Sequence, residues 1–389
     1  MERSPTASSA SRSGLPRVRT AQAPHDEAGA LDRLADALGR DLAFLALFVS
    51  SDADFAAVMA GAAERYPGAV VTGCTTAGEI GGGGYAEGAI VAVGLPRDHF
   101  VAVPILVPDL DAFDGQTLVG DMIRARTTLM AQAPRWGHEF AFLLVDGLSV
   151  REDELVAALA PGLGPVPLFG GSAGDGSRFR ETLVALGGEV LRHAAVLCMI
   201  RTDCEVEVFT LNHLRPTATR MVVTEADPSR RIVRQINAEP AAREYARVLG
   251  KDPEQLSAFT FAAHPVVVRF GGTHHVRAIQ RMLDNGDLVF FSAIDEGLVL
   301  TLAEPEDMAA HLERELARIG RGRQAEAIWA CDCILRRLEA EQTQQTRALS
   351  AVLARNRVVG FSTYGEQING MHVNQTMTGI AIFAPENEE

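Results

Sequence analysis

The stretch VVTGCTTAGEIGGGG, residues 70–84, joins a short β-branched run to a turn of glycine, small hydroxyl residues and a carboxylate. Similar phrases occur twice more, as VPLFGGSAGD (residues 166–175) and VVGFSTYGE (residues 358–366). In each case an apolar run precedes the turn and another apolar run comes after it. A phrase that recurs in this way indicates an internal repeat, and the repeat decides the fold.

Each phrase belongs to a longer unit of strand, helix, strand, turn and strand. In the first unit, FLALFVSS (residues 44–51) is an apolar run of strand length, and apolar residues then recur at helical spacing over residues 55–62. The second unit begins with FAFLLVDGLS (residues 140–149), and the third with AIWACDCILRRL (residues 327–338), whose start predicts a strand. Strands that are apolar on both faces and joined by helices predict a parallel sheet covered by helices.

The predicted fold class is therefore mixed α/β, with two domains built from repeated strand–helix–strand units. Gly73, Gly170 and Gly360 lie at matching places in the three units, so we expect their strands to occupy equivalent positions. Residues 1–35 are expected to form a disordered tail, because the first 25 residues are rich in Ser, Ala, Pro and Arg. The two domains are placed at residues 36–220 and 221–389.

A different pattern separates the second and third units. Residues 232–249 have near-helical apolar spacing and predict a helix. The runs HPVVVRFGG, HHVRAIQRML and DLVFFSAI follow, with GG and NG pairs typical of hairpins. We therefore expect a β-meander in the C-terminal domain, joined to the N-terminal domain by residues 215–227.

Composition limits the partners and the compartment. The formal net charge is -14, which argues against nucleic acid and anionic membrane surfaces, because both require a basic surface. The five cysteines, an odd number without a regular framework, suit a reducing compartment, and the absence of a CxxC pair argues against a structural zinc site. No apolar run reaches the roughly 20 residues that a membrane helix needs. The expected location is the cytoplasm.

The sequence offers two candidate nucleophiles, but a non-enzymatic role explains both better. GGSAG around Ser172 fits the nucleophile-elbow pattern, but no helix is predicted after it. Thr75 and Ser362 occupy the matching place in the other units, so the recurring hydroxyl is better explained by turn hydrogen bonds. Cys74 is expected to fill the core. A hydrolase using Cys74 or Ser172 remains the second alternative.

The carboxylates Glu79, Asp175 and Glu366 recur with the turns. They have two interpretations: as acceptors for backbone N–H groups of their own turns, or as groups that converge on one ligand. The sequence leaves both interpretations open.

Two longer phrases are specific enough to indicate a family. GCTTAGEI near the front and GFSTYGEQINGMHVNQTMTGIAIF at the end resemble the FIST family, a bacterial and archaeal sensory module with an N-terminal and a C-terminal FIST domain. The resemblance covers roughly residues 40–385. INAEPAAREYA, FAAHPVVVR, FFSAIDEGLVLTLA and CDCILRRLE are similar to one branch, the nitric-oxide-sensing FIST haemoproteins.

The resemblance implies a cytoplasmic sensor that binds haem b non-covalently and takes nitric oxide as its ligand. It also implies regulation, in trans, of a histidine kinase or of a cyclic-di-GMP enzyme, either a diguanylate cyclase or a phosphodiesterase, and leaves a homodimer open. The first alternative is a haem-free sensor of a small molecule such as an amino acid. That alternative would use the three turn carboxylates together with Thr75, Ser172 and Ser362.

The haem hypothesis requires an axial ligand. His372 and His264 lie in the most family-like phrases, and His372 ranks first because the third turn carries Tyr364, a candidate ring for a pocket wall. Arg336 is expected to pair either with a haem propionate or with an acid of the protein.

Overall fold

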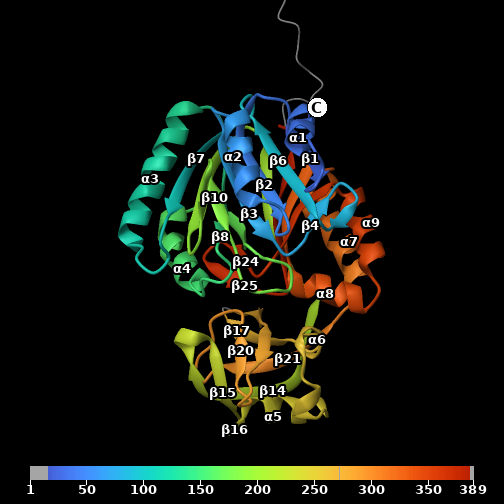
Figure 1. Ribbon diagram of the computed structural model, residues 1–389. Helices are drawn as coiled ribbons and strands as arrows, with labels where there is room; N and C mark the ends of the chain where they lie inside the picture. Colours follow the sequence, from blue (N-terminus) through green and yellow to red (C-terminus); the bar gives the residue numbers. More distant parts are fainter. Residues whose placement is uncertain (1–15, 271, 386–389) are drawn as a thin grey trace, which may run out of the picture.

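The structure is a computed structural model that describes residues 16–270 and 272–385. It confirms the mixed α/β class. Three six-stranded sheets lie together in a body whose helices are on the outside, and a fourth, antiparallel sheet forms a smaller module beside it (Figure 1). We call these two parts the body and the module.

The body consists of three repeats with one element order: strand, helix, strand, helical segment, strand, short hairpin and strand. The first repeat comprises β1 (Arg19–Pro24), α1 (Ala30–Leu38), β2 (Leu42–Ser50), α2 (Phe55–Arg65), β3 (Val70–Thr76), β4 (Glu79–Gly81), β5 (Gly84–Ala86) and β6 (Ala89–Pro96). The second repeat comprises β7 (Phe100–Val107), α3 (Gly115–Gln132), β8 (His138–Val145), α4 (Glu152–Leu163), β9 (Leu168–Ser172), β10 (Val184–Leu186), β11 (Glu189–Leu191) and β12 (Ala195–Thr202).

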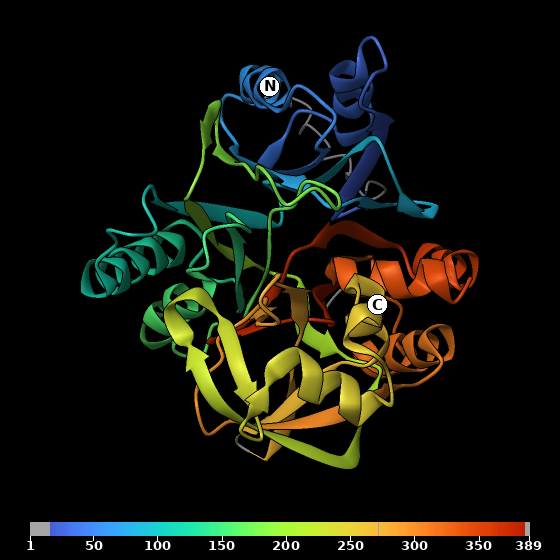
Figure 2. The ribbon, with the colours of Figure 1, turned by 60° about the horizontal axis from the view of Figure 1, so that its bottom comes forward.

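The third repeat has the same order, but the module is inserted after its first strand. This repeat comprises β13 (Glu205–Leu211), α7 (Met308–Arg318), β22 (Ala327–Cys333), α8 (Ile334–Gln342), α9 (Thr346–Arg355), β23 (Val358–Thr363), β24 (Glu366–Ile368), β25 (Met371–Val373) and β26 (Met377–Phe383). A 3₁₀ turn, η3 (Ile319–Gly322), follows α7. Figure 2 shows the blue, green and red repeats arranged around a common centre.

The expected equivalence of the three glycines is confirmed. Gly73, Gly170 and Gly360 lie on β3, β9 and β23, each paired in parallel with the second strand of its own repeat (β2, β8 and β22). A Cβ atom added to them would lie 2.7, 2.2 and 1.8 Å from the carbonyl oxygen of the residue opposite. Glycine is therefore required by the close approach of two backbones at the same point of each repeat.

The hairpins are exchanged between repeats. The β4–β5 hairpin of the first repeat pairs with β23 of the third, β10–β11 of the second pairs with β3 of the first, and β24–β25 of the third pairs with β9 of the second. Each sheet thus contains four strands of one repeat and a hairpin from another. The three repeats cannot separate without breaking these strand pairs.

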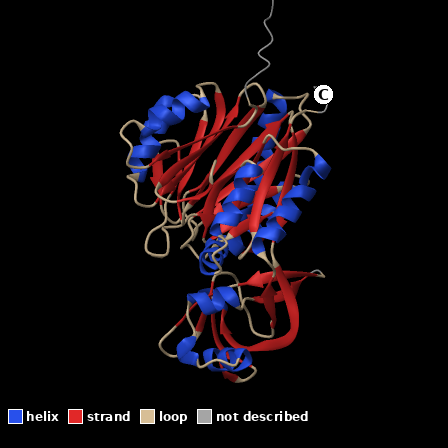
Figure 3. Ribbon diagram, turned by 90° about the vertical axis from the view of Figure 1, so that its right-hand side faces the viewer, coloured by secondary structure: helices blue, strands red, loops and turns tan. Residues whose placement is uncertain are grey.

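The core follows from strands that are apolar on both faces. On β2, Phe44 and Phe48 point to the centre of the body, whereas Leu45 and Leu47 point outward beneath α1 and α2. The sheet of β8 packs in the same way against α3 and α4, and the sheet of β22 against α7 and α9. Figure 3 shows the strands inside and these helices around them.

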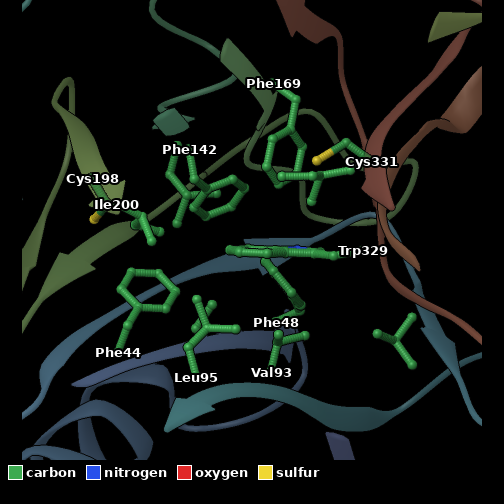
Figure 4. Close-up of a cluster of buried hydrophobic side chains, with 14 of the residues drawn as sticks. Phe44, Phe48, Val93, Leu95, Phe142, Phe169, Cys198, Ile200, Trp329 and Cys331 are labelled. Atoms are coloured by element: carbon green, nitrogen blue, oxygen red, sulfur yellow. The ribbon is translucent and has the colours of Figure 1, made fainter. Parts of the chain in front are cut away.

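Aromatic rings from all three repeats meet at the centre. The Trp329 ring lies 4.0 Å from that of Phe142 and 5.0 Å from that of Phe169, measured between centroids (Figure 4). Phe44 and Phe48 of the first repeat lie on its other side, at 5.8 and 6.0 Å. The buried rings make one core of the three repeats.

The module has its own hydrophobic core and a curled antiparallel sheet. It comprises β14 (Leu214–Asp227), η1 (Pro228–Arg230), β15 (Ile232–Ile236), β16 (Glu239–Pro240), α5 (Ala241–Leu249), η2 (Pro253–Gln255), α6 (Ala258–Ala263), β17 (Val266–Phe270), β18 (Thr273–Arg277), β19 (Ile279–Met282), β20 (Leu288–Phe290) and β21 (Val299–Pro305). The antiparallel pairs β17–β18 and β19–β20 fulfil the hairpin expectation.

Several local expectations are corrected. The disordered tail expected over residues 1–35 contains β1 and most of α1, and only residues 1–15 of it lie outside the described ranges. The helix predicted over residues 232–249 starts only at Ala241, because Asn237 and Ala238 turn the chain at positive φ (53° and 63°) after the β-branched strand β15. Residues 215–227, expected to be a connection, form most of β14.

The strand predicted at the start of residues 327–338 ends at Cys333, and α8 begins at Ile334. Arg336 therefore lies on a helix. His264, expected to open a strand, caps the C-terminus of α6 instead. None of the helices in the described ranges is both long and apolar enough to cross a membrane.

Candidate functional site

A cavity of about 530 Å³ lies between the body and the module. On the body side it opens beyond the carboxyl ends of the parallel pair β8 and β9, the place where ligands bind in open α/β sheets. On the module side it is bounded by η1, β19 and β20. The cavity is lined by Gly147, Leu148, Val150, Glu152, Arg178, Phe179, Arg230, Arg231, Gln280, Arg281, Val289, Phe290, Phe291 and Tyr364.

Aromatic rings form one wall of this cavity. Phe179 stacks on Tyr364 with ring centroids 4.4 Å apart, and Phe291 of the module lies 5.9 Å from Phe179. The Tyr364 hydroxyl is held by Asp175 and by the carbonyl of Gly176, so the ring cannot swing freely. Burial and the hydrogen bond to Asp175 raise the pKa of Tyr364, which keeps its hydroxyl neutral.

Arg231 joins the module to the body. Its guanidinium donates to Glu152 of α4 at 2.8 Å, to Asp153 at 3.0 Å and to the carbonyl of Phe291. The residue is 6% exposed and has a φ of +55°, a strained conformation for a side chain other than glycine. A buried ion pair of this kind is costly to break from one side, so it fixes the module against α4.

Two further cations remain available for a ligand. Arg230 and Arg281 are exposed at the cavity, and their guanidinium groups form no hydrogen bond or ion pair with the residues that the structure describes. Arg178 is engaged with Asp52 at 3.1 Å. Glu152 is neutralised by Arg231, so the unpaired charge at the cavity is positive. The arrangement can hold an anionic group next to an aromatic surface.

The three small-residue turns do meet, but they bind one another. Each turn donates a backbone N–H to the next one around the centre. The bonds run from Ala77 to the carbonyl of Ser362 (3.0 Å), from Tyr364 to that of Ser172 (3.2 Å) and from Gly174 to that of Thr75 (3.0 Å). This ring of bonds closes one end of the body.

The turn hydroxyls are buried in this closure. Thr75 accepts a hydrogen bond from the backbone N–H of Leu183 at 3.0 Å, and Ser172 accepts one from the amide of Gln367 at 2.9 Å. The Ser362 hydroxyl is buried and has no hydrogen-bond partner among the described residues. None of the three lines the cavity at the module.

The turn carboxylates accept hydrogen bonds from their own turns, which is the first of the two interpretations given above. Glu79 and Glu366 each accept a bond from the threonine hydroxyl three residues earlier, both at 2.5 Å. Each also accepts a backbone N–H near the start of the last strand of its repeat, at 3.1 and 3.2 Å. Asp175 accepts three backbone N–H groups, from residues 179–181, at 2.8 to 3.0 Å. The carboxylates therefore fasten the turns.

Burial governs the acidity of two of these groups. Desolvation raises the pKa of Glu79, and it raises the pKa of Glu366 to about 8 despite the hydroxyl donors of Thr363 and Thr376. No described cation forms an ion pair with Glu366. Its side chain is consequently protonated in the folded protein over most of the physiological range.

The residues considered for haem do not come together. His372 is 3% exposed on β25, where Gln367 contacts its Nδ1 at 3.2 Å. Its Nε2 has no hydrogen-bond partner within the described ranges, and it would lie 2.8 Å from a Cβ built on Gly365. His264 is half-buried, and Arg336 is fully buried in an ion pair with Asp332.

These positions decide how well haem fits. The cavity lining contains no histidine, cysteine or methionine, and the hydroxyl of its one tyrosine, Tyr364, is already bonded to Asp175. Neither His372 nor His264 lines the cavity. The residues present therefore supply no axial ligand there, and haem does not fit this cavity as the structure holds it.

Side chains able to hold a metal ion gather elsewhere in the described part of the chain. One group is His99, Asp203 and Cys204, and the other is Asp109, Asp111 and His193. The imidazole of His99 contacts the carboxylate of Asp203 at 3.0 Å, and Asp111 is also paired with Arg151. Neither group includes a predicted haem ligand.

The two candidate nucleophiles are both inaccessible. Cys74 and Ser172 are 0% exposed, and burial raises the pKa of the Cys74 thiol well above its ordinary value. Neither side chain can attack a substrate in this conformation. A reactive cysteine would need an accessible, electropositive setting instead.

Sequence reasoning missed most of the cavity. Arg230 and Arg231 follow a proline turn, and Phe291 lies in an apolar run whose pattern predicts only a strand. The one local feature that points to this cavity is the pair of adjacent arginines at a turn. Of the residues singled out beforehand, only Tyr364 lines the cavity.

Comparison with known families agrees with this architecture. The FIST N domain model matches residues 43–239, and the FIST C domain model matches residues 241–369. The junction between the two lies inside the module, between β16 and α5. No curated protein matches the chain. FIST domains are sensory domains of signal transduction, and because the two models together cover most of its length, the chain belongs to the FIST family.

Proposed function

We propose that the protein is a signal-transduction sensor that binds a small anionic molecule with a flat apolar part in the cavity between body and module. The observation that carries this proposal is the pairing of an aromatic wall with cations that have no ion-pair partner among the described residues. A cavity of about 530 Å³ falls in the size range of ordinary small-molecule sites.

The charge of the ligand follows from Arg230 and Arg281. A carboxylate or a similar anion placed between them would gain charge-assisted hydrogen bonds, each contributing roughly 1.5 to 3 kcal/mol when desolvated. The flat part follows from Phe179 and Phe291, whose rings lie on the two sides of the junction between body and module. The two rings are tilted by 47° with centroids 5.9 Å apart, so a planar group would pack against their side that faces the cavity, not between them.

The position of the cavity suggests how binding is reported. Its walls come from both parts, and Arg231 already ties the module to α4. A ligand that contacts both parts favours one placement of the module over others, because it binds that placement more tightly. A partner in trans, either a histidine kinase or a cyclic-di-GMP enzyme, is proposed to read that placement.

Isothermal titration with a matched pair of probes tests the proposal. Indole-3-acetate and indole-3-acetamide share the ring and differ in charge. We expect the acetate to bind at least 10-fold more tightly, and we expect the Arg230→Gln/Arg281→Gln variant to lose that difference. Equal affinities for both probes in the wild type would contradict the anion site.

Haem and nitric oxide form the second candidate, and one observation favours them. His372 Nε2 is buried beside the third turn and has no partner within the described ranges. Against them stands the cavity lining, which contains no histidine. A visible spectrum of protein produced with a haem supply decides the matter: a Soret band that shifts in His372→Ala favours haem, and a spectrum without such a band removes it.

A further inference from the structure

A second cavity, of about 340 Å³, lies beyond the carboxyl ends of β2 and β3. Ser50 and Thr76, both in its lining, are paired at the ends of these two strands. The first cavity has the matching place in the second repeat, beyond the ends of β8 and β9. The two cavities are therefore related by the internal repeat, and both lie where α/β sheets bind ligands.

A buried cation is incompletely bonded in this second cavity. Arg337 of α8 is 6% exposed, and its guanidinium lies over the Tyr85 ring. Its Nη2 donates to the carbonyl of Ala86 and to Glu87, both at 3.1 Å, and its Nε reaches Glu341 at 3.4 Å. Its Nη1 is buried with no hydrogen-bond partner among the described residues. An unpaired guanidinium donor at a cavity wall can bond an acceptor that is not part of the protein, either a water molecule or an anionic group.

The first turn is built to admit this guanidinium. A Cβ on Gly78 would lie 2.1 Å from Arg337 Nη1, and Gly78 has a φ of +119°. Only glycine leaves the space and adopts this backbone conformation without strain. The carbonyl of Gly78 is bonded to the N–H of Ser362, so the turn cannot move aside.

The rest of the lining is mostly polar and includes five acidic residues, Asp52, Glu79, Glu87, Asp175 and Glu341, of which Glu79 and Asp175 are bonded within their own turns. Ser50, Ser51, Thr76 and Ser177 contribute hydroxyl groups. At the rim, Asp52, Glu87 and Glu341 are 62, 78 and 47% exposed in their side chains, and each has carboxylate lone pairs left for donors.

From these groups we propose that the second cavity binds a compact carboxylate that carries hydroxyl groups. Its carboxylate would accept from Arg337 Nη1, and its hydroxyls would donate to the rim carboxylates. The inference does not depend on the site between body and module, and it concerns a different set of residues.

Titration calorimetry with three probes of one skeleton tests the class of ligand. Glycerate has the carboxylate and hydroxyls, glycerol lacks the carboxylate, and L-serine replaces a hydroxyl with an amino group. We expect glycerate to bind at least 10-fold more tightly than glycerol. Glycerate no tighter than glycerol, or binding of L-serine without binding of glycerate, would overturn the proposal.

Two variants test the location. Arg337→Gln removes the orphaned donor, and we expect glycerate affinity to fall about 10- to 100-fold, the range for a lost bond to a charged group. Leu338→Trp, at a half-buried position on the same wall, blocks the cavity without removing a buried charge. Arg281→Gln, in the first cavity, is the matched control and should leave glycerate binding unchanged. Full glycerate affinity in a folded Arg337→Gln or Leu338→Trp protein would place the binding elsewhere.

Discussion

Single residues in the turns determine how the repeats fit together. Gly78, Gly365 and Gly174 occupy equivalent positions in the three turns. Gly78 leaves space for Arg337, Gly365 for His372 and Gly174 for Ala77, so the neighbour differs in each repeat. Because the residue that packs against this glycine differs between repeats, three similar turns have different surroundings. The family-like histidine is one of these neighbours.

Glu366 should make stability depend on pH. Its pKa is about 8 in the folded protein and near its ordinary value of 4.5 when unfolded, so the folded state holds a proton that the unfolded state has lost between these values. Stability contributed by this group is therefore complete below pH 4.5 and falls by about 1.4 kcal/mol per pH unit as the pH rises toward 8.

Glu366→Gln keeps an acceptor toward Thr376 and offers its amide to Thr363, so it should remove that pH dependence. We expect urea titrations to show the variant gaining on the wild type from pH 5 to pH 8. Parallel stability curves across this range would show that the carboxyl group is ionised in the folded state.

Gly360→Ala should be strongly destabilising. Its Cβ would lie 1.8 Å from the carbonyl oxygen of Ala330, and its φ of +150° is unfavourable for alanine. We expect a loss of at least about 2 kcal/mol in the free energy of unfolding. Gly82→Ala is the control, because nothing lies within 4 Å of its added Cβ, and it should change stability by less than about 0.5 kcal/mol. Equal melting temperatures for the two variants would refute the backbone contact.

At the level of strands and helices, a buried polar network holds the entrance of the module. His213 lies between β13 and β14. Its Nδ1 is hydrogen-bonded to Arg336 Nη1 at 2.8 Å, and its Nε2 is hydrogen-bonded to Glu339 at 2.9 Å. Arg336 also binds Asp332 at 2.7 Å. Since a guanidinium can only donate, His213 Nδ1 must accept, and Nε2–H donates to Glu339. Burial and the nearby Arg336 lower the pKa of His213, which keeps it neutral.

His213→Ala should therefore cost about 1 to 3 kcal/mol, because Arg336 Nη1 and the Glu339 carboxylate each lose a hydrogen bond in a buried site while Arg336 keeps Asp332. Chemical denaturation measures this loss. His138→Ala, at a half-buried position at the start of β8, is the control and should cost much less. A loss below about 1 kcal/mol for His213→Ala would mean that water replaces the imidazole.

The sequence was informative about these elements up to a definite limit. The strand–helix–strand order and the three glycines were predictable, because apolar periodicity and repetition are local properties. The exchange of hairpins was not, because β4, β10 and β24 are three residues long and their partners are decided by the packing of whole repeats. The cavity was missed for a similar reason, since Glu152, Arg231 and Tyr364 meet only through the inserted module.

At the level of the whole molecule, the module is a compact insertion in the body. The chain enters the module after His213 and leaves it before Glu306, and the backbone N–H of Glu306 donates to the carbonyl of His213 at 2.7 Å. The two ends of the insertion are thus adjacent, and the module has its own core.

Replacing residues 214–305 with a short Gly/Ser linker should leave a folded body. The exchanged hairpins and the shared aromatic core should make it unfold in one cooperative transition, as followed by circular dichroism and by Trp fluorescence. Binding of indole-3-acetate should be lost, because half of the cavity wall is gone. Failure of this shortened chain to fold would show that the body depends on the module.

Hydrogen–deuterium exchange with and without indole-3-acetate tests whether the ligand bridges the two parts. We expect slower exchange in the β8–α4 connection and around Phe179 in the body, and at the same time in η1 and the β19–β20 hairpin of the module. Protection confined to one of the two parts, or found only in segments remote from the cavity, would contradict a sensor site between body and module.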